Sequence, residues 1–356
     1  MKISFRHGWA MLSAAVLSLT ALPLSAVSSI TTISAAAAAA PVVENLDRGI
    51  VAIKSGNGML VSWRFLASDP TGTEFRLYRD DQLLMTSKGD EATCFYDESG
   101  SASARYRVDS LVNGTVQTTS TCSLISGTDY FQIPMDVPTA SDCTYSPNDC
   151  SVGDVDGDGV YELFVKWDPS NSKDNSQKGK TGNVYIDCYK LTGEKLWRID
   201  MGKNIRAGAH YTQFLVADFD GDGYAEMTCK TADGTVDGTG KTIGDGSKDY
   251  RNSSGYILSG PEYYTLFDGR TGAALDTINY VPDRGTVSKW GDKYGNRVDR
   301  FLGSVAYLDG VHPSAVTIRG YYTRMTATAY DVVDKKIPFL GICLGLQLLF
   351  ESSEET

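Results

Sequence analysis

The sequence is short of long apolar runs and of positive charge. Beyond its N-terminal segment, no stretch reaches the roughly 18 apolar residues that a membrane-spanning helix needs, so we expect no membrane span. Asp and Glu outnumber Lys and Arg by 44 to 33, which gives a formal net charge of −11. An acidic chain of this kind argues against nucleic acid as a partner. If the ligand is itself a polyanion, local cations must bind it against the field of the whole chain.

The first 40 residues have the composition of a secretory signal peptide. Lys2 and Arg6 precede an apolar run over residues 9–24, and small residues follow up to a poly-Ala tract. Cleavage is expected either after Ala26 or near Ala40. Removal of the segment takes away two cations and no carboxylates, so the net charge moves from −11 to −13. We therefore expect an exported, extracellular protein, and we expect it to be a monomer.

The chain has seven cysteines, an odd number that leaves one without a disulfide partner in an exported protein. A pair such as Cys143 with Cys150 is possible, and the connectivity is open. Cys188 and Cys229 fall in predicted strands, where we favour buried, unreactive thiols. Cys343 stands apart in the C-terminal segment.

A nine-residue pattern of alternating carboxylates and glycines, DxDGDGxxE, occurs at residues 154–162 and again at 218–226. Three carboxylates at alternate positions can converge on one point, because the glycines let the backbone curl tightly. The final Glu can reach back to the same point. Such an oxygen cage suits a hard cation, so Ca²⁺ is the expected cofactor. An Asp-Gly turn that binds nothing is the alternative.

The pattern differs from an EF-hand, which places a bidentate Glu at position twelve between two helices. The predicted ligands are the side chains of Asp154, Asp156, Asp158 and Glu162 in the first copy, those of Asp218, Asp220, Asp222 and Glu226 in the second, and the backbone carbonyls of Val160 and Tyr224.

Residues 42–135 read as short alternating strands separated by tight turns. Examples are the strand at 59–63 and the turns Asn57-Gly58 and Asn113-Gly114. With Trp63 as an expected core residue, this pattern indicates a β-sandwich. It resembles a fibronectin type III module, for which we expect a supporting role.

Residues 145–330 follow a different pattern. Each unit opens with an acidic glycine loop, passes through a strand, and reaches two strands joined at Thr192-Gly193 or at Thr271-Gly272. A third unit begins near Val305 with its acidic loop degraded. Such repetition suggests antiparallel blades of a β-propeller. The expected fold is therefore all-β: a sandwich followed by a partial calcium-binding propeller, since three units cannot close a ring.

Several segments within residues 42–330 resemble rhamnogalacturonan lyases of polysaccharide lyase family 11. They include NDCSVGDVDGDGVYELFVKWDPSNSKDNSQ, KNIRAGAHYTQF, DFDGDGYAEMTCKTADGTVDGTGK and WGDKYGNRVDRFL. The resemblance implies a fibronectin-like domain, a large calcium-studded propeller, and cleavage of the rhamnogalacturonan I of pectin by β-elimination. It also implies that Asn148 and Asp168 contact the sugar and that Asp149 lies beside a calcium ion. The two acidic loops are then expected to pin the sugar-facing loops at Asn148 and Asp168.

β-Elimination removes the C5 proton of a uronate, so it needs a nearby base and a cation that draws charge toward the carboxylate. Calcium or a basic side chain can supply the cation. The local candidates are Arg206, His210, Tyr211 and Lys230. For His210 the alternative is a packed histidine that contacts backbone.

The segment before the C-terminal tail supplies side chains that we assign to the fold rather than to substrate. Arg297 and Arg300 are expected to pair with nearby carboxylates such as Asp292 and Asp299. The consecutive pair Tyr321–Tyr322 is expected in the core.

From about residue 332 the chain departs from the lyase pattern. The segment KKIPFLGICLGLQLLFESSEE has a GxCxG turn between an apolar strand and a helix. It resembles class I glutamine amidotransferases, specifically the subunit of imidazole glycerol phosphate synthase, which implies that Cys343 is a nucleophile and Gln347 its neighbour in the motif. We therefore expect residues 332–356 to be a foreign fragment in a chimeric or misassembled reading frame. A divergent blade with a coincidental turn is the alternative.

The sequence thus predicts a secreted, calcium-dependent rhamnogalacturonan lyase that has little or no activity as this truncated chain. A non-catalytic pectin-binding module is the alternative. A third reading, a glutamine amidotransferase fragment of histidine biosynthesis, is weakened because Cys343 lacks its base. Endo and exo action are both open, and the general base is not identified.

Overall fold

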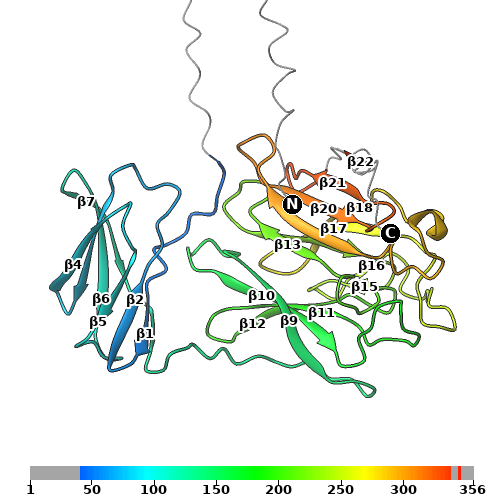
Figure 1. The fold of residues 1–356 in the computed structure, drawn as a ribbon, viewed down its shortest axis with the longest axis horizontal. Helices are drawn as coiled ribbons and strands as arrows, with labels where there is room; N and C mark the ends of the chain where they lie inside the picture. The colour runs from blue at the N-terminus through cyan, green and yellow to red at the C-terminus, as the bar shows by residue number, and fades with distance from the viewer. Residues whose placement is uncertain (1–40, 338–343, 346–356) are drawn as a thin grey trace, which may run out of the picture. The chain divides into compact units, whose positions relative to one another are not determined.

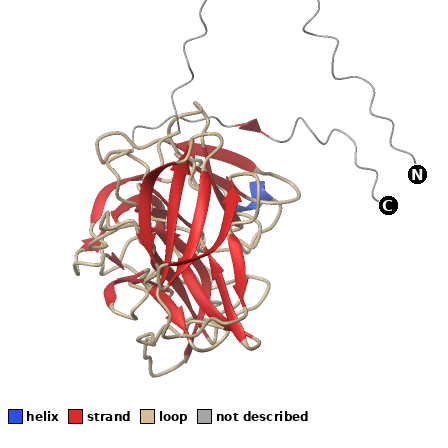
Figure 2. Cartoon of the chain, turned by 90° about the vertical axis from the view of Figure 1, so that its left-hand side faces the viewer, coloured by secondary structure: helices blue, strands red, loops and turns tan. Residues whose placement is uncertain are grey.

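The computed structural model describes residues 41–337 and 344–345. Strands make up nearly all regular structure in these ranges, together with one 3-10 helix, η1 (Val287–Trp290) (Figures 1 and 2). The all-β expectation is therefore confirmed. None of the described helical structure is long and apolar enough to cross a membrane.

Two four-stranded sheets lie within residues 51–126. Their orders are β5-β2-β1-β8 and β4-β3-β6-β7, and every pairing is antiparallel except that of β1 with β8. The strands are β1 (Val51–Ser55), β2 (Gly58–Ser62), β3 (Glu74–Arg79), β4 (Gln82–Lys88), β5 (Cys94–Asp97), β6 (Tyr106–Val112), β7 (Thr115–Thr121) and β8 (Leu124–Ser126).

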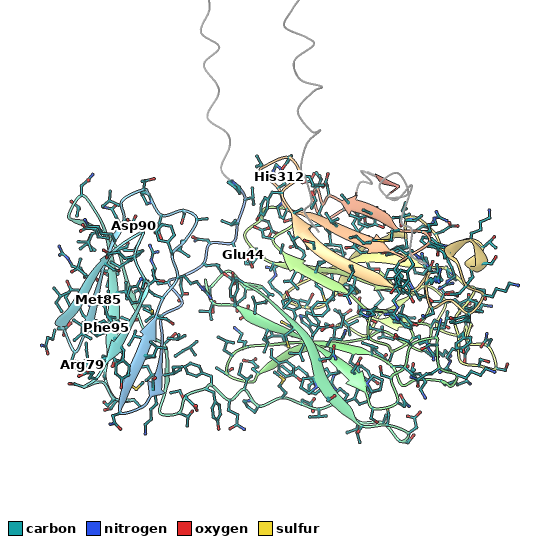
Figure 3. The ribbon with its side chains drawn as sticks, viewed as in Figure 1. Glu44, Arg79, Met85, Asp90, Phe95 and His312 are labelled. Atoms are coloured by element: carbon teal, nitrogen blue, oxygen red, sulfur yellow. The ribbon has the colours of Figure 1, made fainter. Side chains whose placement is uncertain are left out.

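Alternate side chains of these two sheets meet in one buried cluster, as the period-2 pattern of a strand requires. Val61 from β2 and Phe75 from β3 have no exposed surface in it. Met85 and Phe95, labelled in Figure 3, pack against the same cluster. Trp63 is also buried there, so its expected core position is confirmed.

Three further antiparallel sheets follow, with the orders β16-β15-β12-β11-β10-β9, β13-β14-β17-β18 and β19-β20-β21-β22 (Figure 1). None of them closes on itself within the described ranges. Their strands are β9 (Tyr145–Gly153), β10 (Glu162–Pro169), β11 (Tyr185–Tyr189), β12 (Lys195–Asp200), β13 (Phe214–Ala217), β14 (Glu226–Thr231), β15 (Thr235–Val236), β16 (Thr242–Ile243), β17 (Tyr263–Asp268), β18 (Ala274–Asn279), β19 (Phe301–Ala306), β20 (Ser314–Arg319), β21 (Thr326–Tyr330) and β22 (Leu344–Gly345).

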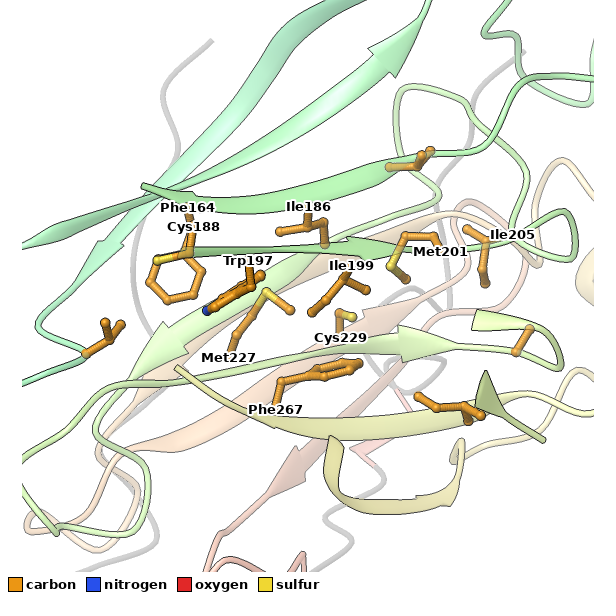
Figure 4. Close-up of a cluster of buried hydrophobic side chains, with 14 of the residues drawn as sticks. Phe164, Ile186, Cys188, Trp197, Ile199, Met201, Ile205, Met227, Cys229 and Phe267 are labelled. Carbon is orange, nitrogen blue, oxygen red and sulfur yellow. The ribbon is translucent and has the colours of Figure 1, made fainter. Parts of the chain in front are cut away.

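A second buried cluster fills the space between the first two of these sheets. Phe164, Ile186 and Trp197 come from the β9–β12 sheet, and Met227 and Phe267 come from the β13–β18 sheet. In Figure 4 the side chains of the two sheets point toward one another. The cluster fixes the spacing of the two sheets and thereby the positions of their hairpin loops.

Cys188 and Cys229 are part of this second cluster (Figure 4). Both are buried, as expected, and burial raises the pKa of both thiols far above the ordinary range. Their lack of reactivity stays a prediction. The six cysteines within the described residues are all unpaired. The possible disulfide between Cys143 and Cys150 is therefore not formed.

Candidate metal loops and substrate-facing residues

The two acidic repeats form the hairpin loops between β9 and β10 and between β13 and β14. In the first loop, Asp154 accepts hydrogen bonds from the backbone N–H groups of Gly157 (2.7 Å) and Gly159 (2.8 Å). Glu162 Oε2 accepts one from the N–H of Val155 at 2.9 Å. Gly157 and Gly159 have φ of 77° and 84°, a left-handed conformation that glycine adopts without strain. These bonds curl the loop so that its carboxylates face inward.

The second loop repeats the same geometry position by position. Asp218 accepts from Gly221 (2.8 Å) and Gly223 (3.0 Å), and Glu226 Oε2 accepts from Phe219 at 3.0 Å. The two loops are neighbours, because the N–H of Ala225 donates to the carbonyl of Asp154 at 2.8 Å.

Three carboxylates converge in each loop, and their ligand oxygens lie within 4.8 Å of one another. That spacing fits ligands on opposite sides of one calcium ion, whose bonds to oxygen are about 2.3–2.6 Å long. The converging groups are Asp154, Asp156 and Glu162 in the first loop and Asp218, Asp220 and Glu226 in the second.

Asp158 and Asp222, also predicted as ligands, lie outside these converging groups. Their Oδ1 atoms accept from the backbone N–H groups of Val160 (2.8 Å) and Tyr224 (3.0 Å). Roles for these two carboxylates, and for the carbonyls of Val160 and Tyr224, stay predictions.

The electrostatics of the loops also favour a cation. Burial, reinforced by the neighbouring Asp charges, raises the pKa of Glu162 to about 7 and that of Glu226 to about 9. One lysine pairs with each loop: Lys190 with Asp156 at 2.6 Å and Lys335 with Asp222 at 3.0 Å. One ammonium group per loop leaves most of the negative charge uncompensated, so the donor set fits a divalent ion.

Sequence reasoning missed a further carboxylate at these loops, Glu44 (Figure 3). Its Oε1 accepts from the backbone N–H of Asp154 at 2.8 Å. Burial, followed by the charges of Asp154 and Asp218, raises the pKa of Glu44. No local motif marks Glu44, because it contacts residues about a hundred positions later in the chain.

The segment around Glu44 forms hydrogen bonds with two hairpin loops, β9–β10 and β19–β20. The N–H of Asp47 donates to the carbonyl of Gly159 at 2.9 Å, and the N–H of Val42 donates to Val311 in the β19–β20 loop at 2.7 Å. Tyr307 of that loop donates its hydroxyl to the carbonyl of Val42 at 2.8 Å. We call residues 42–47 the strap.

Asn148, Asp149 and Asp168 lie together where β9 pairs with β10. Asp168 is opposite Ser146, and a register shift between Val165 and Trp167 lies opposite Asn148 and Asp149. The buried ammonium group of Lys166 pairs with Asp149 and lies 3.4 Å from the carbonyl of Thr212.

The polar groups of this corner differ in exposure. Asn148 is exposed, whereas Asp168 is partly buried and its Oδ1 lacks a hydrogen-bond partner among the described residues. Burial raises the pKa of Asp168. Asp149 belongs to neither group of converging carboxylates, so its role beside calcium stays a prediction.

The acidic loops and this corner are at opposite ends of β10. Glu162 begins the strand and Asp168 is next to its last residue, so about six residues of extended chain, roughly 20 Å, separate them. The acidic loops therefore do not contact Asp168 along this strand, and their expected role in holding the sugar-facing loops stays a prediction. Ions bound in these loops would stabilise the ends of the strands that lie opposite the Asp168 corner.

Three of the four candidate catalytic residues line one cavity. Arg206, Tyr211 and Lys230 surround a space of about 10 Å³ together with Arg284 and Asp299. Such a space holds about one water molecule, which is far too small for a sugar.

The contacts of these three side chains are structural. All five N–H groups of Arg206 donate to backbone carbonyls, at 2.7–3.5 Å, in the segments 173–179 and at Gly255. The hydroxyl of Tyr211 accepts from the N–H of Asn175 at 2.6 Å and lies 3.3 Å from Asn296 Oδ1. His210, by contrast, is partly exposed, and its carbonyl accepts from the N–H of Phe301 at 3.0 Å.

Lys230 belongs to a buried network of ion pairs that no sequence motif predicts. Glu262 forms ion pairs with Lys230 (3.0 Å), Arg284 (2.9 Å) and Arg319 (2.8 Å). Asp299 Oδ1 lies 3.6–3.9 Å from the same three cations. Burial alone would raise the pKa of Glu262, but the three positive charges hold it well below the ordinary range. The residues come from five separate segments, so only the tertiary structure brings them together.

The pair Tyr321–Tyr322 is not a core pair. Tyr322 is 85% exposed, so the expectation of burial is wrong for this residue. Arg300 pairs with Asp174 at 2.8 Å, which confirms that it has a carboxylate partner. Arg297 has no ion pair within the part of the chain that the structure describes; its side chain donates to Thr323 at 2.7 Å.

Some predicted residues fall outside the described ranges. They are the signal peptide at residues 1–40 and the tail residues Cys343 and Gln347. A short similarity does exist to imidazole glycerol phosphate synthase subunit HisH of Methanocaldococcus jannaschii, with 68% identity over 28 residues, or 8% of this chain and 14% of that protein.

Two family models match the chain. The model described as "Rhamnogalacturonan lyase family 11, C-terminal domain" matches residues 130–340. The model described as "Rhamnogalacturonan I lyases beta-sheet domain" matches residues 41–124.

Two proteins of Bacillus subtilis (strain 168) are similar in sequence. The chain is 55% identical to rhamnogalacturonan endolyase YesW over 305 residues and 52% identical to rhamnogalacturonan exolyase YesX over 295 residues. These matches cover 84% and 81% of this chain but 49% and 48% of the relatives, so the chain spans about half the length of the curated relatives it matches.

The folds agree as well. The crystal structure of YesW matches with a TM-score of 0.79 and 54% identity, over 87% of this chain and 54% of that one. The family model over residues 130–340 alone accounts for more than half of the sequence. The chain therefore belongs to rhamnogalacturonan lyase family 11.

Proposed function

We propose that this chain is part of a secreted, calcium-dependent lyase that cleaves rhamnogalacturonan I of pectin by β-elimination. The observation that carries the proposal is the family match across residues 130–340. The two Bacillus subtilis relatives are a rhamnogalacturonan endolyase and an exolyase, so both modes of cleavage stay open. Export rests on the composition of residues 1–40.

The fold that we propose for this function has two domains. The two sheets of residues 51–126 and their common core support a fibronectin type III-like sandwich over residues 42–135. The three later sheets support the assignment of residues 145–330 to blades of a partial propeller. Each of these sheets has one hairpin loop at an end that it shares with the other two.

We propose that Ca²⁺ binds both acidic loops and stabilises them. When bound, the ion neutralises carboxylates that otherwise repel one another. Because the loops are roughly 20 Å of strand away from Asp168, we assign these two sites to the stability of the fold. At the other end of β10, Asn148 and Asp168 would bind the sugar, and Lys166 keeps Asp149 in place.

His210 is the candidate general base that the geometry favours. Unlike Arg206, Tyr211 and Lys230, it does not line the small cavity, and it is partly exposed. It also lies two residues from Thr212, whose carbonyl is in contact with Lys166 beside the Asn148 corner.

The test is the release of unsaturated uronate from rhamnogalacturonan I, followed by its ultraviolet absorbance with calcium and with a chelator. Product that requires calcium supports the lyase. His210→Ala should lower the rate by roughly a hundredfold or more if it is the base. The matched control is His312→Ala, an exposed histidine that hydrogen-bonds Asp309. Equal rates for the two variants would remove His210 from the reaction.

A second function, binding of pectin without cleavage, is favoured by the small cavity around three of the four catalytic candidates, which has no room for a sugar. Retention of the chain on immobilised rhamnogalacturonan I with no unsaturated product would establish it, and would agree with the expectation of little activity. If the chain is not retained and also forms no product, both functions are contradicted.

A further inference from the structure

Tyr322 and Arg297 form an exposed surface that we call the platform. The ring of Tyr322 is 85% exposed, and the guanidinium carbon of Arg297 lies 5.8 Å from its centroid. Tyr322 has φ of 62°, a left-handed conformation that is unfavourable for a bulky residue. The backbone thus holds an aromatic side chain in water at an energetic cost.

A ring contact and hydrogen bonds support the platform from below. Tyr321 lies against Tyr322 with ring centroids 4.5 Å apart, and its hydroxyl accepts from Asn296 Nδ2 at 3.0 Å. Thr323 Oγ1 accepts from Arg297 at 2.7 Å and donates to the carbonyl of the fully buried Trp290 at 2.8 Å. A ring held by such neighbours loses little conformational entropy when a ligand stacks on it.

The charge of this surface opposes that of the chain. The backbone N–H of Arg297 donates to Asp292, but its guanidinium group has no carboxylate partner among the described residues, and neither do the ammonium groups of the exposed Lys289 and Lys293 nearby in the sequence. Unpaired cations are notable in a chain with a net charge of −11. They provide the local positive field that a polyanionic ligand needs against the overall negative charge.

Hydrogen bonds and ion pairs connect the platform to the corner proposed to bind the sugar. Asn296 lies between the hydroxyls of Tyr321 and Tyr211, at 3.0 and 3.3 Å. Thr212, the next residue, contacts Lys166 through its carbonyl, and Lys166 pairs with Asp149. One scaffold therefore supports both surfaces.

We propose that Tyr322 and Arg297 form a subsite for a uronate residue of an acidic polysaccharide. The ring of Tyr322 stacks on the C–H face of the sugar, and Arg297 pairs with its carboxylate. The proposal rests on the proposed function for its ligand class, but it concerns binding and requires no cleavage.

The experiment measures the retardation of the full chain in native gels that contain rhamnogalacturonan I, its carboxyl-reduced form, or dextran. Tyr322→Ala should weaken binding to both forms of the pectic polymer by roughly fivefold. Arg297→Gln should weaken binding to the acidic form by about fivefold and leave the reduced form unaffected.

Matched controls lie away from the platform. Tyr130→Ala removes another exposed tyrosine. Arg105→Gln removes an exposed arginine from the two sheets within residues 51–126, which we call the two-sheet unit. Both should bind like the unmodified chain. Because Tyr322 and Arg297 hold little of the core, melting temperatures should agree within about a degree or two.

Three outcomes would overturn the subsite: unchanged retardation of both platform variants, equal losses in the control variants, or no greater retardation of the unmodified chain by rhamnogalacturonan I than by dextran. Failure of the lyase is a different result, since it leaves retardation intact and removes only the unsaturated product.

Discussion

At the scale of single residues, Glu262 has the most demanding environment. It is buried with two arginines and a lysine around its carboxylate. Removing any one of these charged groups would leave an oppositely charged group unpaired in the interior, which costs folding free energy. The network therefore depends on the ionised form of Glu262.

Glu262→Gln should destabilise the protein by about 3–5 kcal/mol at neutral pH, because it removes the nearer of the two carboxylates that the three cations share. The pKa of Glu262 is lower in the folded state than in the unfolded state. Its stabilising contribution is therefore present above the ordinary glutamate pKa and is lost as the pH falls below it. Urea unfolding at several pH values should show the two proteins converging below about pH 4.

Glu194→Gln is the control for this prediction, since Glu194 is exposed. It should change the free energy of unfolding by less than about 0.5 kcal/mol at every pH. A Glu262→Gln cost that does not shrink in acid would show that the carboxylate charge is not what stabilises the network.

At the scale of elements, the acidic hairpin loops are built from local hydrogen bonds whose acceptors are the carboxylates themselves. Asp154 and Asp218 each accept two backbone N–H groups. The same residues face their neighbours' negative charges. The loops are thus preorganised for a cation, and their repulsion is relieved when one binds.

Glu226→Gln should weaken calcium binding by roughly tenfold or more, because it removes one of three converging carboxylates. Titration calorimetry on chelator-treated protein measures this change. Glu98→Gln, an exposed residue of the two-sheet unit, should leave the affinity unchanged. Equal affinities for the two variants would place the ion elsewhere.

At the scale of the whole molecule, the strap connects the start of the described chain to loops of three later sheets. Its amides at Val42 and Asp47 donate to Val311 and Gly159, while Glu44 approaches Asp154 and Asp218. Loss of calcium should increase the repulsion between Glu44 and the carboxylates of the loops, because the positive charge of the ion then no longer offsets them.

Hydrogen exchange provides the measurement. A chelator should accelerate exchange of the Val42 and Asp47 amides by roughly tenfold or more. The Asp80 amide, which donates to Arg105 within the two-sheet unit, should be unaffected. Uniform acceleration at all three amides would indicate global destabilisation, and no acceleration at the strap would contradict the coupling.

The sequence by itself determined what depends on short separations along the chain. Alternation of apolar residues gave the all-β class, and the DxDGDGxxE pattern gave loops whose carboxylates converge, because the bonds that curl them span only three to seven residues. The tertiary structure decided the rest. It placed Glu44 against Asp154, gathered Lys230, Glu262, Arg284 and Arg319, and held Tyr322 in water. It also separated the acidic loops from Asp168 by the length of β10. These features depend on which strand ends the packed sheets bring together, and sheet packing is set by contacts between residues far apart in the chain.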